Sequence, residues 1–202
     1  MTVRVLLAED QTMVRGALAA LLSLEGDIEI VAEASRGDEV LPAALESGPD
    51  VALLDIEMPG GDGLGAAADL REKLPSCRVI ILTTFGRAGY LRRAMESGAA
   101  GFLLKDAPAS DLASAIRRTI DGERVVDPVL ATTALSAGDN PLTSREREVL
   151  AASADGATIE DVARKLHLSE GTVRNYLSTA IKKLAARNRV EASRLAESNG
   201  WL

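Results

Sequence analysis

Residues 51–63 read VALLDIEMPGGDG, an apolar run that carries an aspartate near its end and then breaks into a glycine-rich turn. Such a run is short enough for one buried strand, and the turn after it can lead into a helix. Asp55 is the unusual residue, because an ionised carboxylate is costly to bury without a cation or hydrogen-bond donors. The rest of the chain has to supply those partners or leave Asp55 outside the core.

Four further apolar runs flank this one within residues 1–122, and a segment with helical spacing follows each of them. Short apolar strands that alternate with amphipathic helices are typical of a parallel sheet covered on both faces. We therefore predict an α/β fold with a doubly wound, five-stranded parallel sheet, for which the flavodoxin-like order 2-1-3-4-5 is a common solution. The predicted strands are residues 3–8, 28–32, 51–54, 79–83 and 101–104.

The pattern changes after Gly122. Residues 123–138 have helical potential in their middle but run into a series of turn formers, so we interpret them as a linker. Residues 139–202 predict a small all-α domain of four short helices, beginning with a capping box between Thr143 and Glu146. The second and third of these helices are joined by a tight turn, which is typical of a helix-turn-helix.

Composition excludes several classes of protein. With 202 residues, 47% of them hydrophobic, the chain can form two globular cores. No apolar stretch approaches the roughly 20 residues of a membrane-spanning helix, and the N-terminus turns acidic too early for a secretory signal, so we expect a cytoplasmic protein. A single cysteine and a single histidine exclude an internal disulfide, a cysteine-based zinc site and most metal-hydrolase schemes.

Charge is distributed unevenly along the chain. The net charge is −7, and residues 1–122 alone hold 12 basic against 19 acidic residues. Residues 139–202 hold 10 basic against 9 acidic residues, and within them residues 164–189 hold seven basic residues and one acidic residue. This basic segment can supply a surface that binds DNA phosphates, although a solvated helix face would carry the same charges.

Polar residues follow four of the five predicted strands. In an open parallel sheet the carboxyl ends of the strands form one edge, where functional groups collect. Close carboxylates repel one another unless a divalent cation neutralises them, and an all-oxygen ligand set suits Mg²⁺. The residues at this edge are Glu9, Asp10, Asp55, Thr83 and Lys105.

An aspartate beside Mg²⁺ can act as a nucleophile toward phosphorus and form an aspartyl phosphate. The cation and Lys105 would stabilise the charge on the transferred phosphoryl group, and Thr83 could donate its hydroxyl to the product. Glu9 and Asp10 could instead be helix caps and Lys105 a surface charge. Those separate explanations do not account for polar residues at four strand ends.

The motifs Glu9-Asp10, LLDIEMPGGDGL (53–64), IILTT (80–84) and GFLLKDA (101–107) resemble the signature of a response-regulator receiver domain. The resemblance implies that Asp55 is the phosphoacceptor, that Lys105 pairs with the phosphate and that Thr83 and Phe102 form a switch pair. It also implies a Mg²⁺ site formed by the carboxylates of Glu9, Asp10 and Asp55 and the backbone carbonyl of Glu57.

The third predicted helix of the second domain has two different faces. Val173, Leu177 and Ala180 recur with helical spacing on one face, whereas Asn175, Ser178 and Lys182 lie opposite and Arg174 lies on the flank. A helix in the major groove requires such a division. Arg174 and Asn175 are the best candidates to read bases, and Lys182 and Lys183 are expected to contact phosphates, although an ordinary bundle helix is the alternative.

Residues 140–150 and 168–184 resemble the LuxR-type helix-turn-helix of NarL/FixJ response regulators, so the two resemblances together cover nearly the whole chain. The motifs TTFGRAGY (83–90), LLKDAP (103–108) and GTVRNY (171–176) resemble the DesR-like subgroup. The resemblance implies a two-component transcription regulator, a sensor histidine kinase and a double-stranded DNA operator as partners, and a homodimer on phosphorylation. The dimer face that it implies comprises Val14, Leu18, Leu112 and Ile116.

Two other functions stay open at this point. One is a Mg²⁺-dependent phosphohydrolase with Asp55 as a transient nucleophile and Glu57 as its acid or base; turnover of small phosphate esters would reveal it. The other is a DNA-binding regulator that does not need phosphorylation and uses the receiver only to dimerise. We rank both below the phosphorylation switch, and we expect no turnover enzyme.

Overall fold

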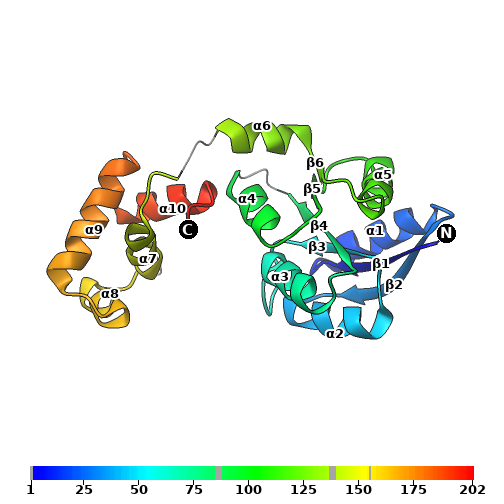
Figure 1. The fold of residues 1–202 in the computed structure, drawn as a ribbon, viewed down its shortest axis with the longest axis horizontal. Coiled ribbons are helices and arrows are strands. Elements are labelled where there is room, and N and C mark those ends of the chain that lie inside the picture. The colour runs from blue at the N-terminus through cyan, green and yellow to red at the C-terminus, as the bar shows by residue number, and fades with distance from the viewer. Residues whose placement is uncertain (1, 85–87, 137–139, 155) are drawn as a thin grey trace. The chain divides into compact units, whose positions relative to one another are not determined.

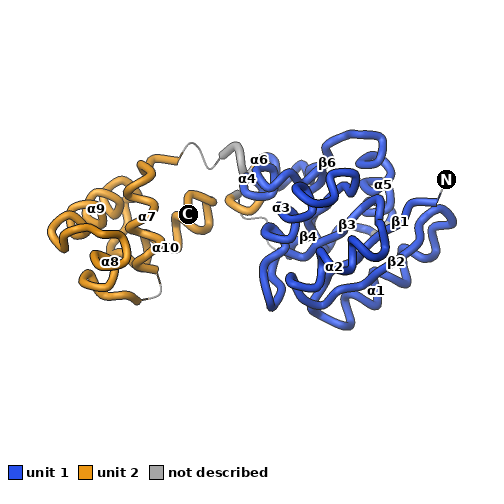
Figure 2. The backbone as a smooth tube through the Cα atoms, turned by 60° about the horizontal axis from the view of Figure 1, so that its bottom comes forward, with its two compact units in different colours: residues 1–86, 91–131 blue, residues 87–90, 132–202 orange. Residues whose placement is uncertain are grey.

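The computed structural model describes residues 2–84, 88–136, 140–154 and 156–202 (Figure 1). The chain divides into two compact units, one of residues 1–86 and 91–131 and the other of residues 87–90 and 132–202 (Figure 2). The predicted linker, residues 123–138, spans this division, and the turn formers at 137–139 lie outside the described residues.

The first unit is built on a parallel sheet in the order β2-β1-β3-β4-β5-β6. Helices α1 and α5 pack together on one face, and α2 and α3 pack together on the other (Figure 1). The strands are β1 (Val3–Ala8), β2 (Ile28–Ala34), β3 (Val51–Asp55), β4 (Arg78–Thr83), β5 (Gly101–Leu104) and β6 (Val125–Val126). The helices are α1 (Thr12–Ser23), α2 (Gly37–Ser47), α3 (Gly63–Lys73), α4 (Ala88–Glu96) and α5 (Ala109–Ile120).

The doubly wound α/β architecture and the 2-1-3-4-5 order are confirmed, and the structure adds one strand to the five predicted. Strand β6 extends the edge beside β5, with Val125 opposite Gly101. Two residues are too few to show a strand period, so this addition had no sequence signal. Helix α6 (Pro128–Ser136) follows it and accounts for the helical potential of the predicted linker.

Strand register brings the polar strand ends to one edge of the sheet. All pairs in the sheet are parallel, and Asp55 at the end of β3 lies opposite Leu82, next to Thr83 at the end of β4. Thr83 in turn lies opposite Leu104, the last residue of β5. Lys105 then donates its backbone N–H to the carbonyl of Thr83 at 2.8 Å, which fixes it at the same edge.

The apolar cluster between α5 and the sheet contains two residues of the expected dimer face. Ile116 has no exposed surface and Leu112 is 6% exposed, because both belong to the core cluster that contains Leu7 and Leu103. Both side chains therefore pack in the core, and their role at a dimer interface stays a prediction. Leu18 of α1 packs at the margin of the same cluster and remains half-buried, as does Val14.

Within residues 140–154 and 156–202 the structure describes four helices around a small core of mainly aliphatic residues. Thr143, Thr158 and Ser169 each accept a hydrogen bond from the backbone N–H three residues later, and the predicted capping box at Thr143 is confirmed. Val173, Leu177 and Ala180 are buried, as their spacing predicted. The helices are α7 (Ser144–Ala152), α8 (Ile159–Leu166), α9 (Glu170–Lys183) and α10 (Arg189–Ser198).

Candidate acidic site and nucleic-acid interface

The turn after β3 explains the glycines that follow Asp55. A Cβ atom at Gly63 would lie 2.0 Å from the backbone oxygen of Asp55, so only glycine permits the chain to return this closely. Gly61, at φ +131°, supplies a backbone conformation that side chains disfavour. Asp62 then caps α3 by accepting the N–H of Gly65 at 2.7 Å. The turn thus holds Asp55 firmly at the end of its strand.

Three carboxylates gather beside the end of β3. Glu9, Asp10 and Asp55 each place an oxygen within 4.8 Å of the others. Asp10 is exposed, whereas Glu9 is 1% and Asp55 5% exposed. Asp55 is therefore more deeply buried than its position at the carboxyl end of a strand suggests. Its partner is the ammonium of Lys105, which lies 2.9 Å from Asp55 Oδ1 and 2.6 Å from Glu9 Oε2.

Burial and charge act against each other in this cluster. Burial raises the pKa of Glu9 and of Asp55, although the hydrogen bonds from Lys105 oppose the rise. Burial also disfavours the Lys105 ammonium, but its hydrogen bonds to Glu9 and Asp55 outweigh that effect and raise its pKa. With all four groups ionised, three carboxylates face one ammonium and leave two negative charges, which a divalent cation would neutralise.

A cavity of about 120 Å³ lies at this site, and further residues that the sequence predicted for the site line it. Glu57 and Thr83 line it together with Asp10, Asp55 and Lys105. Phe102 does not line it and is fully buried. Phe102 lies opposite Ile81, two residues before Thr83 on β4, so Thr83 and Phe102 lie on the same face of the sheet.

Helix α9 presents the polar face that was predicted for contact with DNA. Arg174, Asn175, Ser178 and Lys182 are exposed, whereas the opposite face packs on α7 and α8. Helices α8 and α9 are joined through His167, which adopts φ 54° and ends α8. The four exposed residues thus occupy one surface of the second helix of a helix-turn-helix.

Comparisons with known proteins agree with this arrangement. Residues 5–117 match the family described as "Response regulator receiver domain", and residues 140–196 match "Bacterial regulatory proteins, luxR family". The chain belongs to the LuxR-type response regulators. The first unit therefore contains a receiver domain and the second a LuxR-type DNA-binding domain, a combination that is not a known enzyme family.

Known proteins match this chain over nearly the whole length of both chains. The chain is 49% identical to the uncharacterized transcriptional regulatory protein YvfU of Bacillus subtilis (strain 168), over 99% of this chain and 100% of that protein. It is 44% identical to the transcriptional regulatory protein DesR of the same organism, over 98% of both chains. The crystal structure of the response regulator ChrA, from a heme-sensing two-component system, superimposes with a TM-score of 0.61 at 35% identity, covering 100% of this chain and 99% of that chain.

The LuxR-type domain neutralises most of its basic segment internally. Five of the seven basic side chains in residues 164–189 have partners in the domain. Most of those partners lie outside residues 164–189, so a count of charges within this segment does not include them. Lys165 and Lys182 form no side-chain ion pair or hydrogen bond with the described residues. The partnered residues are Arg164 with Glu160 and Asp161, Arg174 with Glu170, Lys183 with Glu146, Arg187 with Glu191, and Arg189 with the carbonyl of Ala157.

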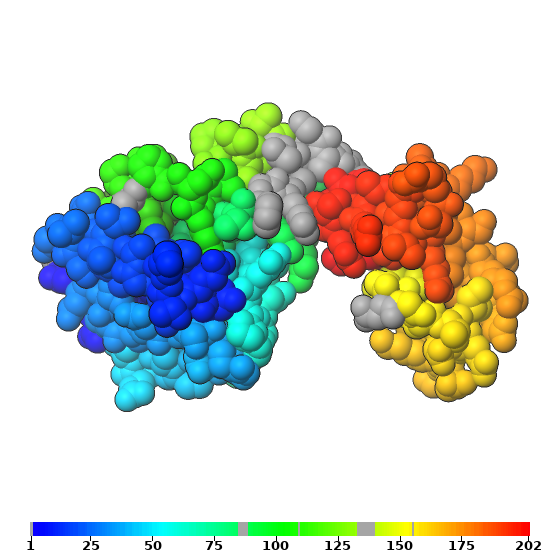
Figure 3. All heavy atoms as spheres, turned by 180° about the vertical axis from the view of Figure 1, so that it is seen from behind, coloured from blue at the N-terminus to red at the C-terminus, as the bar shows by residue number. Residues whose placement is uncertain are grey.

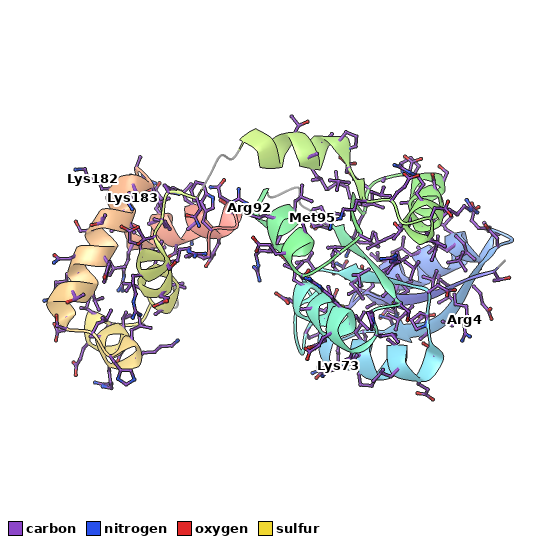
Figure 4. The ribbon with its side chains drawn as sticks, in the orientation of Figure 1. Arg4, Lys73, Arg92, Met95, Lys182 and Lys183 are labelled. Carbon is purple, nitrogen blue, oxygen red and sulfur yellow. The ribbon has the colours of Figure 1, made fainter. Side chains whose placement is uncertain are left out.

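Lys183 has a structural partner that spacing did not reveal. Its ammonium lies 2.7 Å from Glu146 Oε2, and Glu146 is 4% exposed although Lys183 is about one-third exposed. Burial alone would raise the pKa of Glu146, but Lys183 and the donors of Thr143 hold it below the usual value. Lys182 and Lys183 both lie near the C-terminal end of α9 (Figure 4), and Lys182 is the better candidate for a phosphate contact.

Replacing Lys183 with methionine is expected to destabilise the LuxR-type domain. The substitution leaves the buried Glu146 carboxylate without its cation and should lower the free energy of unfolding by about 1–3 kcal/mol. A fully buried ion pair would lose more, but Lys183 is partly exposed to solvent. Because the folded pKa of Glu146 is depressed, the pair stabilises the fold above the unfolded pKa and loses this effect as the pH falls through the folded pKa. Urea unfolding at neutral pH and near pH 3 measures the difference.

The control for that prediction is Lys182→Met, which removes the same charge one residue away. It should leave the free energy of unfolding within about 0.5 kcal/mol of wild type, as expected for an exposed side chain without a partner. Equal destabilisation by both substitutions would show that the Glu146 pair is not what stabilises the domain.

Proposed function

We propose that this protein is a transcription regulator controlled by phosphorylation of Asp55. The observation that carries this proposal is the convergence of Glu9 and Asp55 on the Lys105 ammonium, with Asp10 within reach of both carboxylates. The residual charge of two negative units suits a divalent cation rather than a second lysine. A sensor histidine kinase, or a small phosphodonor, would supply the phosphoryl group in the cytoplasm. Among the described residues no helix is both long and apolar enough to span a bilayer.

Mg²⁺ fits the oxygen donors of the site. Glu9, Asp10 and Asp55 would hold it through carboxylates and Glu57 through its backbone carbonyl, and the bound cation would neutralise charge on the phosphoryl oxygens. The Asp55 carboxylate oxygen attacks phosphorus, the bond from phosphorus to the donor breaks, and the donor leaves with its electron pair. Lys105 is then free to turn from the carboxylates to the new phosphoryl oxygens, and Thr83 can donate its hydroxyl to them.

Thr83 and Phe102 would couple phosphorylation of Asp55 to a conformational change of the receiver. A Thr83 hydroxyl drawn toward the phosphoryl group vacates space on the sheet face that it shares with the buried Phe102 ring, whose movement would alter the outer surface of the receiver. Phosphate must favour the active state by about 5.5 kcal/mol to change its population from 1% to 99%.

Dimerisation is assigned to α1, whose surface forms part of the blue region in Figure 3. A cavity of about 300 Å³ beside α1 is lined by Met13, Val14, Leu18 and Leu21 of α1 and by Leu112 of α5. Met13 is 87% and Leu21 45% exposed, so a second receiver could contact this apolar surface. The fully buried Ile116 offers no such surface. Two receivers that pair in this way would bring two helix-turn-helix units to a pair of DNA half-sites.

The proposal is tested by selecting binding sites from a pool of random DNA duplexes. The full chain treated with Mg²⁺ and acetyl phosphate should recover duplexes with two related half-sites, and the untreated chain should recover few. Equal recovery of the same sequences without a phosphodonor would contradict phosphorylation control and support the alternative in which the receiver only dimerises.

A further inference from the structure

A second polar cavity lies at the opposite edge of the receiver sheet from Asp55. It occupies about 260 Å³ where β4 begins and where α4 has ended ahead of β5. Met95, which is labelled in Figure 4, contributes an apolar wall from α4, and Val79 contributes another from β4. Three arginines line it from separate parts of the chain: Arg71 at the end of α3, Arg78 at the start of β4 and Arg124 just before β6.

This cavity is lined by cations without matching anions. None of the described residues that line it is acidic. Arg71 donates to the backbone carbonyl of Glu96 at 3.1 Å, and within the described part of the chain the guanidinium groups of Arg78 and Arg124 have neither an ion pair nor a hydrogen bond. Such a group of arginines is unexpected in a domain whose residues 1–122 hold 12 basic against 19 acidic residues.

Neither Cys77 nor Asp50 cancels this positive charge. Burial raises the pKa of the Cys77 thiol to about 12, so this lining residue is neutral at pH 7. Asp50 lies close enough to contribute to that rise, but it does not line the cavity, and its single negative charge is smaller than the three positive charges of the arginines. The cavity therefore keeps a local excess of positive charge.

Gly98 allows Arg71 to lie across the cavity wall. A Cβ atom at this position would be 2.5 Å from Cδ of Arg71, and the residue adopts φ +92°. The backbone therefore passes directly against the arginine stem, and the hydrogen bond to Glu96 holds the guanidinium. One of the three cations is positioned before any ligand arrives, which lowers the ordering cost of binding.

We propose that this arginine pocket binds a small oxyanion with two or more negative charges, such as a phosphate, a diphosphate or a phosphate ester. A guanidinium group can donate two parallel hydrogen bonds to the oxygens of a phosphate or a carboxylate. Three guanidinium groups offer more donors and more positive charge than one carboxylate can pair with. The volume suits a metabolite-sized anion, since pockets for drug-sized ligands occupy about 300–1,000 Å³. Neither phosphorylation nor DNA binding, as proposed above, uses this pocket.

The test is isothermal titration calorimetry of the full chain with sodium pyrophosphate, inorganic phosphate and citrate as separate probes. The chain is first treated with EDTA and then dialysed into a metal-free buffer without polyanions, so that no divalent cation can recruit an anion to the Asp55 site and no chelator competes for the pocket. The double variant Arg78→Gln/Arg124→Gln should bind pyrophosphate at least 10-fold more weakly than wild type. The matched control is Arg36→Gln, which removes an exposed arginine of the same domain and should change the dissociation constant less than 2-fold.

The three probes separate the sources of a polyanion. Preference for pyrophosphate over citrate supports a phosphate-bearing ligand, whereas the reverse preference overturns phosphate specificity in favour of a polycarboxylate. Equal weakening in Arg36→Gln and in the double variant, or absence of binding by a wild-type chain that is folded by circular dichroism, overturns the pocket. Phosphorylation of Asp55 with Mg²⁺ should remain intact in the double variant, so failure of one proposal is distinguishable from failure of the other.

Discussion

Replacing Asp55 with asparagine should reduce phosphoryl incorporation from near one group per chain to background. The substitution removes the nucleophilic oxygen but keeps the size of the side chain, and Lys105 retains its contact with Glu9 at 2.6 Å. The variant should therefore fold. The measurement is the intact mass of the chain after incubation with acetyl phosphate and Mg²⁺, which increases by one phosphoryl group only if an acceptor is present.

The matched control is Asp69→Asn, the same chemical change at an exposed position on α3. It should be phosphorylated like wild type. Phosphoryl incorporation that persists in Asp55→Asn at the wild-type level would place the acceptor elsewhere. Loss of incorporation in both variants would show that the assay reports folding rather than chemistry.

Replacing Arg174 with alanine should weaken binding to the selected operator by about 1–3 kcal/mol, a loss of about 5- to 150-fold, and relax the base preference at one position. Arg174 is exposed on α9, and Glu170 one turn earlier holds its guanidinium at 2.6 Å. That pair must open or rearrange when Arg174 contacts a base. The measurement is fluorescence anisotropy with the operator and with a duplex that carries a single base change.

Lys182→Ala distinguishes a phosphate contact from a base contact. It should weaken binding to both duplexes by the same factor and lower the dependence of affinity on salt by about one charge. Arg145→Ala, at an exposed position of α7 in the same unit, is the control and should leave both affinities unchanged. Loss of sequence preference in Lys182→Ala but not in Arg174→Ala would reverse the assigned roles.

Much of the receiver fold could be predicted because its signals are local. Each buried strand is nearly all apolar, each following helix has its own spacing, and the parallel topology then requires Glu9, Asp55, Thr83 and Lys105 to meet at one edge. Strand β6 escaped prediction because two valines carry no period. The burial of Leu112 and Ile116 of α5 in the core could not be predicted, because an amphipathic helix has one apolar face, and periodicity does not say whether a core or a partner covers it.

Side-chain partners far apart in sequence could not be predicted. The capping box marked Glu146 as a backbone partner, but its contact with Lys183 spans 37 residues and depends on how α7 packs on α9. Counting charges over residues 164–189 likewise missed Glu146, Glu160, Asp161 and Glu191, which lie outside that window. The basic surface is consequently smaller than the sequence indicated.

The most direct test of phosphorylation control is sedimentation velocity with Mg²⁺ and beryllofluoride, which mimics a phosphoryl group on aspartate. Wild type should change from monomer to dimer, Asp55→Asn should remain monomeric, and Leu21→Glu, which charges the exposed apolar surface of α1, should also remain monomeric. Leu45→Glu, at a similarly exposed leucine on α2, should dimerise like wild type. If wild type and Asp55→Asn sediment alike under every condition, Asp55 does not control assembly and the central claim is wrong.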